Sequence, residues 1–163
     1  MTAAAGQAET ASDRLARYVL TLKRQFTDVA QITPAELEAL RPRPVLLDAR
    51  SEKEFAVSHL PSAIRVQGDV LHQLAALGLE ADAPIVVYCS VGYRSSVLAQ
   101  KLQAAGFKNV RNLEGSIFAW ANEGRPLVNA HGSTAGVHPF NLLWGRYLDR
   151  DKWRWKPAPG SRG

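Results

Sequence analysis

The single cysteine of the chain, Cys89, lies where a thiol could act as a nucleophile. It directly follows the apolar run 85–88 and precedes Gly92 and Arg94 in the stretch CSVGYRS. A loop between a buried strand and a helix can direct successive backbone N–H groups at one point. The helix N-terminus and the guanidinium would favour the thiolate, the form of cysteine that attacks electrophiles. The pattern predicts nucleophilic chemistry at Cys89.

The loop has the spacing C-x4-R, and its glycine permits a positive φ that a side chain would resist. Phosphatases and arsenate reductases with a cysteine loop have C-x5-R, a wider ring that encloses a tetrahedral oxyanion. A shorter ring favours a smaller anion, such as the terminal sulfur of a persulfide. Phosphatase or arsenate reductase activity is the alternative, which hydrolysis of p-nitrophenyl phosphate would reveal. The predicted catalytic residues are Cys89 and Arg94, and the predicted persulfide-binding residues are Ser90, Val91, Gly92, Tyr93 and Ser95.

Short apolar strands alternate with helices through the middle of the chain. Strands without polar alternation, separated by helices, are typical of a parallel sheet covered on both faces. The predicted fold class is therefore α/β with a central parallel sheet. Ligands bind beyond the carboxyl ends of the strands in such folds, which is where Cys89 falls. Strands are expected at 45–47, 63–66, 85–88 and 109–112, and helices at 33–40, 51–55, 69–77, 95–105 and 116–122. The first two helices are expected to begin with capping boxes, formed by Thr33 with Glu36 and by Ser51 with Glu54.

The cysteine loop resembles the active-site loop of the rhodanese family of sulfurtransferases. A second stretch, LLDARSEKEFAVSHLPSAIRV, is similar to the upstream signature of that family, and NLEGSIFAWANEG resembles its closing helix. The resemblance covers about residues 28–128, with the three motifs in the family's order. It departs from the family at Ser58 and Ser62, where glycines are usual.

The resemblance implies a rhodanese-like fold and a cysteine that accepts a sulfane sulfur, holds it as a persulfide and passes it on. The donor would be a small molecule such as thiosulfate, and the acceptor a thiol, cyanide or a protein. It implies that Asp48, Arg50 and His59 mainly fix the loops around the site. The alternative is a rhodanese-like module that binds a partner and catalyses little. Such modules usually lack the cysteine, which this chain keeps.

No cofactor or metal is expected. The histidines at 72, 131 and 138 lack metal-ligand spacing with one another or with Cys89, and one cysteine cannot form a thiolate cluster or an internal disulfide. No GxxxxGK[ST] loop occurs. The N-terminus lacks the features of a targeting segment, and no apolar run approaches the ~20 residues of a membrane span. We expect a cytoplasmic protein with no membrane partner.

Four segments are expected along the 163 residues. Residues 1–11 have no large apolar side chain after Met1 and are predicted to be disordered. Apolar residues at helical spacing predict a helix over 12–27, with Ser12 as its expected N-cap. The rhodanese-like domain follows at 28–128, and then a basic, Trp-rich C-terminal extension at 129–163.

The extension carries much of the net charge of +5, with six Lys or Arg and two Asp from position 141 onward. Its tryptophans at 144, 153 and 155 favour packing back on the domain. A surface for self-association or a protein partner is the second interpretation, because exposed Trp and Arg often anchor interfaces. Nucleic-acid binding is the weakest, since no recognised binding motif accompanies the aromatic and basic residues.

Overall fold

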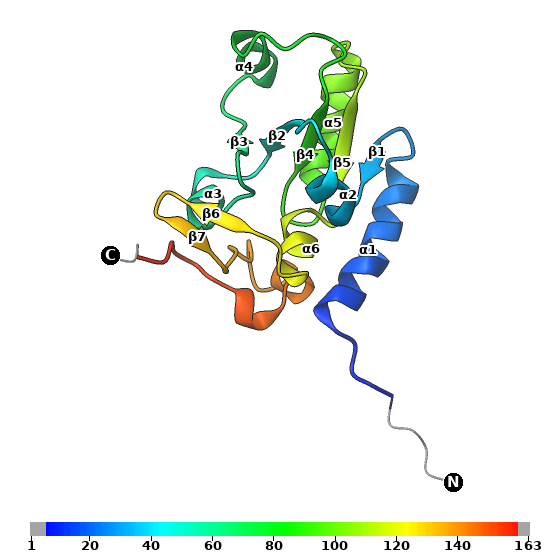
Figure 1. Ribbon diagram of the computed structural model, residues 1–163. Coiled ribbons are helices and arrows are strands. Elements are labelled where there is room, and N and C mark those ends of the chain that lie inside the picture. Colours follow the sequence, from blue (N-terminus) through cyan, green and yellow to red (C-terminus); the bar gives the residue numbers. More distant parts are fainter. Residues whose placement is uncertain (1–5, 160–163) are drawn as a thin grey trace.

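Five parallel strands form the central sheet of the computed structural model, which describes residues 6–159. The order across the sheet is β1-β5-β4-β2-β3 (Figure 1). From β2 the chain continues to β3 on one side of the sheet, and from β4 it continues to β5 on the other side. The loops after β2 and β4 therefore flank the topological switch point, where open sheets bind ligands. The strands are β1 (Ala30–Ile32), β2 (Val45–Asp48), β3 (Ile64–Arg65), β4 (Ile85–Tyr88) and β5 (Val110–Leu113).

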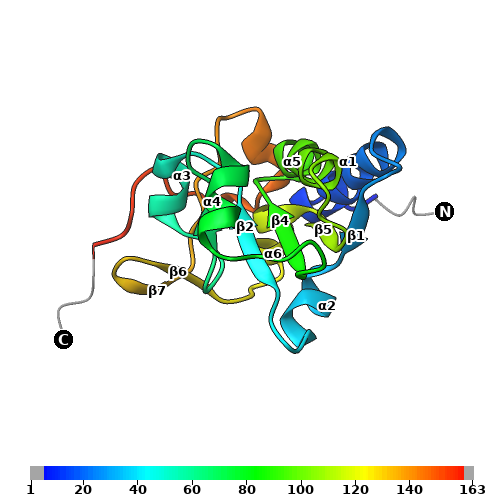
Figure 2. The same ribbon diagram turned by 90° about the horizontal axis from the view of Figure 1, so that it is seen from above.

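Helices cover both faces of this sheet, as predicted (Figure 2). One apolar cluster lies between the sheet and the helices α4 (Val70–Ala76) and α5 (Tyr93–Ala104). The other includes residues of α2 (Pro34–Ala39) and α6 (Ser116–Asn122). The N-terminal helix α1 (Ala11–Gln25) contributes to both clusters. Strand β4 is buried throughout, with alternate residues in the two clusters.

Local capping signals set most helix starts. The helix α3 (Glu52–Val57) follows β2 and begins with the capping box of Ser51 and Glu54, and α2 begins with that of Thr33. The expected Ser12 cap is wrong, because Thr10 forms a capping box with Asp13 and α1 starts at Ala11.

The expected start of α5 at Ser95 or Ser96 is also wrong. The helix begins at Tyr93, since Gly92 is its N-cap with a φ of 120°. The positive φ predicted for Gly92 is confirmed. Because the helix starts earlier, Tyr93 and Arg94 belong to its first turn and not to the loop. Ser62, where the family usually has glycine, also has a positive φ, of 67°.

After the α/β core the chain forms a hairpin, β6 (Leu127–Asn129) and β7 (Gly132–Thr134), and two 3-10 helices, η1 (Trp144–Tyr147) and η2 (Arg150–Lys152). The sequence predicts neither the hairpin nor β1. Their three-residue strands are too short to show a hydrophobic period. Side-chain pairing ties the segment before the hairpin to α2 and to the end of α6, because Arg125 forms ion pairs with Glu38 and Glu123.

The C-terminal extension packs on the domain through two of its tryptophans. Trp144 meets the ring of Tyr18 edge-on at a centroid distance of 5.4 Å. The indole N–H of Trp153 lies within hydrogen-bonding distance of two carbonyl oxygens, those of Gly145 (3.2 Å) and Leu148 (3.0 Å). Both indole rings also pack against the apolar cluster that includes residues of α6, so the packing interpretation holds for these two residues. Trp155 stays 44% exposed, and self-association of the extension stays a prediction.

Residues 1–5 of the segment predicted to be disordered, and the last four residues of the extension, lie outside the described residues. Residues 6–10 are exposed and precede α1 without helical structure. Within residues 6–159, no helix combines the length and apolarity needed to cross a bilayer.

Candidate active site

Cys89 lies at the carboxyl end of β4, directly beside the position where the sheet order reverses. Its side chain is 1% exposed. The backbone N–H of Cys89 donates to Ser116 Oγ at 3.1 Å, so α6 holds the first residue of the loop. The strand that precedes the loop is fully buried, so the position of Cys89 at its carboxyl end is set by the packed core.

The N-terminus of α6 also fixes the next two peptide groups. The N–H of Ile117 donates to the carbonyl of Cys89 at 3.1 Å. The N–H of Phe118 donates to the carbonyl of Ser90 at 3.1 Å. In a planar trans peptide the N–H points away from the C=O. The N–H groups of Ser90 and Val91 therefore point to the side of the loop opposite α6, as an anion-binding nest requires.

Two polar groups approach the sulfur itself. The N–H of Gly92 donates to Cys89 Sγ at 3.2 Å, and the Ser95 hydroxyl lies 3.4 Å from it. That hydroxyl is also 2.6 Å from Asn112 Oδ1, and since it has one proton it can donate to only one of them at a time. No side chain among the described residues caps α5, so the N–H groups of its first turn are open to a further acceptor.

The guanidinium of Arg94 forms a two-pronged ion pair with the buried Glu54. The nitrogen-to-oxygen distances are 2.8 and 3.0 Å, and Nη2 also donates to Ser90 Oγ at 2.9 Å. Burial acts to lower the pKa of Arg94, but the hydrogen bond to Glu54 and the negative charges of Cys89 and Glu54 raise it above its ordinary value. Arg94 is thus a charged donor beside the loop whose positive charge is largely balanced by Glu54.

The ion pair between Glu54 and Arg94 should make the stability of the protein depend on pH in the acidic range. Burial by itself would raise the pKa of Glu54, but hydrogen bonds from Arg94 and Ser51 lower it to about 2. A carboxylate with a lowered pKa stabilises the folded state above its unfolded value, here 4.5, and this contribution is lost as the pH falls toward 2. As the pH falls through this range, the unfolding free energy of the parent protein should decrease by about 3 kcal/mol more than that of Glu54→Gln.

Urea unfolding at several pH values between about 6 and about 2 would measure this contribution of Glu54. The matched control is Glu52→Gln, which changes an exposed glutamate in the same helical turn and should keep the pH dependence of the parent protein. An identical pH dependence in the parent protein and in Glu54→Gln would contradict the prediction.

Asp48 and Arg50 form a second ion pair, with both side chains fully buried. Their closest approach is 2.7 Å, and Arg50 Nη2 also donates to the Ser58 carbonyl at 2.7 Å. Neither side chain hydrogen-bonds to Cys89 among the described residues. Their contacts link the end of β2 to the segment after α3, which is the kind of position that fixes a loop.

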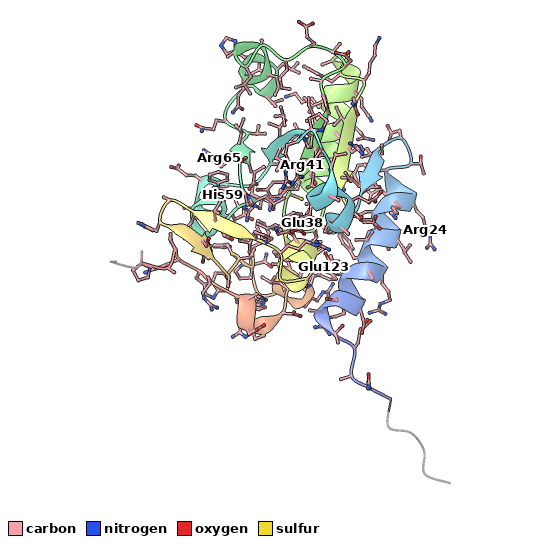
Figure 3. The ribbon with its side chains drawn as sticks, in the orientation of Figure 1. Arg24, Glu38, Arg41, His59, Arg65 and Glu123 are labelled. Carbon is pink, nitrogen blue, oxygen red and sulfur yellow. The ribbon has the colours of Figure 1, made fainter. Side chains whose placement is uncertain are left out.

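His59 lies beside β6, with which its backbone pairs (Figure 3). Its Nδ1 is 2.9 Å from the carbonyl oxygen of Phe55, and the two rings are stacked. Its backbone forms two hydrogen bonds with Val128. Among the predicted site residues, Gly92 and Ser95 hydrogen-bond to Cys89 Sγ. The described contacts of Asp48, Arg50 and His59 are with other residues.

A cavity of about 430 Å³ reaches Cys89. The loop and the start of α5 form one part of its wall, and segments from both ends of the chain form the rest. A second cavity of similar size lies between α1 and α6 and does not reach the sulfur. The residues that line the cavity at the sulfur are Tyr18, Cys89, Ser90, Val91, Tyr93, Arg94, Phe140 and Trp144.

Several residues that contact the loop or line the cavity could not be identified from the sequence. Ser116 and Asn112 contact the loop from distant positions in the chain, and Glu54 is predicted only as a capping partner. Nothing local to Tyr18 or Trp144 indicates that they meet over the cysteine. The one local signal is the glycine before Ser116, which marks the start of α6 beside the loop.

A family model described as "Rhodanese-like domain" matches residues 33–123, which is more than half of the chain. The chain is 32% identical over 88 residues to a sulfurtransferase of Allochromatium vinosum, covering 54% of this chain and 81% of that protein. It is 28% identical over 106 residues to an adenylyltransferase and sulfurtransferase of Candida albicans. That match covers 59% of this chain but only 24% of the other protein.

Solved structures share the fold. A polysulfide-sulfur transferase homodimer of Wolinella succinogenes matches with a TM-score of 0.56 and 25% identity, over 75% of this chain and 94% of that chain. A thiosulfate sulfurtransferase of Pseudomonas aeruginosa matches with a TM-score of 0.60 over 85% of this chain and 27% of that one. At 22% identity the second likeness concerns the fold alone. The predicted fold class is confirmed.

Proposed function

The chain belongs to the rhodanese-like domain family, and from this premise we propose that it is a sulfurtransferase whose nucleophile is Cys89. The observation that carries the proposal is the surroundings of the sulfur. Cys89 Sγ accepts the Gly92 N–H, faces a cavity, and lies at the uncapped start of α5. These features suit a thiolate and a second anionic sulfur bonded to it.

In the proposed reaction the Cys89 thiolate attacks the outer sulfur of a donor such as thiosulfate. A bond forms between Sγ and that sulfur, the sulfur–sulfur bond of the donor breaks, and sulfite leaves with the electron pair. A persulfide anion stays on Cys89. A thiolate of a small molecule or protein, or cyanide in an assay, then attacks the terminal sulfur, and the cysteine thiolate returns. This sequence is a double displacement.

Backbone donors would hold the terminal sulfur of the persulfide. The N–H groups of Ser90 and Val91 point away from α6, and those of the first turn of α5 have no side-chain cap. Donors that are already oriented stabilise developing negative charge without reorganisation, which is often the largest single contribution in a site of this kind.

The direct test is the intact mass of the protein after brief incubation with thiosulfate. We expect a gain of one sulfur atom that cyanide removes, and no gain in Cys89→Ala. If no donor leaves sulfur on the parent protein, the proposal fails and the partner-binding alternative becomes the better account.

Arg94 should matter mainly through its pairing with Glu54. Arg94→Gln leaves a nearly buried carboxylate without its partner close to the thiolate, so we expect kcat/KM to fall by about 10- to 100-fold. The double variant Glu54→Gln/Arg94→Gln removes both charges and should recover part of that loss, by about threefold or more. Steady-state transfer to cyanide measures both.

A double variant as slow as Arg94→Gln alone would contradict this assignment. It would mean that the positive charge of Arg94 acts directly on the reacting sulfur. Far-ultraviolet circular dichroism of each variant would confirm that the loss is not one of folding.

A further inference from the structure

Half of the residues that line the cavity over Cys89 are aromatic, and they come from three separate segments. Tyr18 belongs to α1, Tyr93 to the start of α5, and Phe140 and Trp144 to the C-terminal extension. Three of these four residues lie outside residues 33–123, the part that matches the family model. Substrate contacts at these three positions would therefore come from segments outside the part of the chain that the family model matches.

Packing holds these aromatic side chains in place. The ring of Tyr18 meets Trp144 edge-on and stacks on Tyr147 at a centroid distance of 5.3 Å. Tyr93 meets Phe26 edge-on at 5.6 Å. Phe140 lies against the Arg94 guanidinium, whose central carbon is 4.9 Å from the ring centroid. The cavity is thus bounded by supported side chains, as in ligand sites that are formed before the ligand binds.

The charge of the cavity is low. Arg94 is the only Lys, Arg, Asp or Glu among the described residues that line it, and Glu54 pairs with that guanidinium through both oxygens. A dianion entering this space would meet the Cys89 thiolate and no unbalanced cation, and it would lose part of its hydration. A donor with one negative charge and an apolar group would lose less hydration and would bury apolar surface against the aromatic rings.

We infer that the preferred sulfur donor of this site is an organic, singly charged sulfane-sulfur compound with an apolar or aromatic substituent, rather than inorganic thiosulfate. The inference rests on the proposed function. For a thiosulfonate donor, the Cys89 thiolate forms a bond to the sulfane sulfur. The bond from that sulfur to the sulfonyl group breaks, and a sulfinate leaves with the electron pair.

Three donors separate the effect of charge from that of the aromatic walls: thiosulfate, methanethiosulfonate and benzenethiosulfonate. The last two have the same charge and both release a sulfinate. With cyanide as the fixed acceptor, kcat/KM for the donor reports the first half-reaction. We expect benzenethiosulfonate to exceed methanethiosulfonate by about tenfold or more, and both to exceed thiosulfate.

Variants of the extension test the walls. Phe140→Ala and Trp144→Ala should each reduce the preference for phenyl over methyl by about three- to tenfold. The control Leu143→Ala changes a neighbouring residue that is 60% exposed and does not line the cavity, and it should keep the preference. If Trp144→Ala unfolds, Phe140→Ala suffices, because this side chain is 44% exposed and lies outside the core.

Equal use of the three donors, or a preference for thiosulfate, would overturn the inference, provided that each donor leaves a cyanide-sensitive sulfur on Cys89. The inference would also be overturned if Phe140→Ala and Trp144→Ala both fold and both keep the preference of the parent protein for phenyl over methyl. If no donor leaves sulfur on Cys89, the proposed function fails, and the inference fails with it.

Discussion

Replacing Cys89 with serine should lower the rate of sulfur transfer to cyanide by at least about 10³-fold. The serine hydroxyl is not ionised near neutral pH, so it cannot supply the thiolate that attacks the donor. It also has no sulfur on which a persulfide could form. The Gly92 N–H and the cavity would remain, and the donor would still bind without reacting.

Transfer to cyanide in a continuous assay, together with intact mass after incubation with the donor, would measure this loss. A matched control is Val97→Ala, which changes an exposed residue of α5, the helix that follows the cysteine loop. Val97 does not line the cavity. It should keep the parent rate. Full activity in a folded Cys89→Ser variant would exclude the persulfide mechanism. If the parent protein hydrolysed p-nitrophenyl phosphate and transferred no sulfur, phosphatase activity would be the better account.

Asp48→Ala should destabilise the protein by about 3–5 kcal/mol, the usual effect of removing one partner of a buried ion pair. The side chains of Asp48 and Arg50 are both fully buried and joined by hydrogen bonds at 2.7 and 3.0 Å. Without the carboxylate, Arg50 would keep its charge in the interior, and among the described residues the Ser58 carbonyl would be its one remaining hydrogen-bond acceptor. The melting temperature should fall by about 10 °C or more.

Thermal and urea unfolding would measure the loss, and Glu38→Ala is the matched control. It breaks the more exposed ion pair with Arg125 and should have a much smaller effect. Asp48→Asn should retain most of the destabilisation, because the neutral amide keeps the shape but not the charge. A stability of Asp48→Ala close to that of the parent protein would show that solvent or another group reaches Arg50.

Features that depend on neighbouring residues could be predicted from the sequence. The capping boxes before α2 and α3, the buried strands β2 and β4 and the glycine at the start of α5 all have local patterns. Family-specific spacing then identified the cysteine loop. The errors at helix starts are of one to three residues, because Thr10 competes with Ser12 as a cap and Gly92 begins α5 early.

Features that depend on residues far apart in the chain could not be predicted in this way. Glu54 and Arg94 are 40 positions apart, and the local pattern at Glu54 predicts only a capping role. The packing of α1 against η1 brings Tyr18 to Trp144, over a separation of more than 100 residues. No local pattern distinguishes an aromatic residue that packs in a core from one that lines a cavity.

The sequence by itself determined the cysteine loop that holds the proposed nucleophile and the parallel α/β frame, because strand burial, capping and the placement of a glycine act over a few residues. Only the tertiary structure decided the environment in which that nucleophile works. Glu54 balances the charge of Arg94, and the two ends of the chain enclose the sulfur in aromatic walls. Charge balance and the shape of a cavity result from packing between distant segments, which no short stretch of sequence specifies.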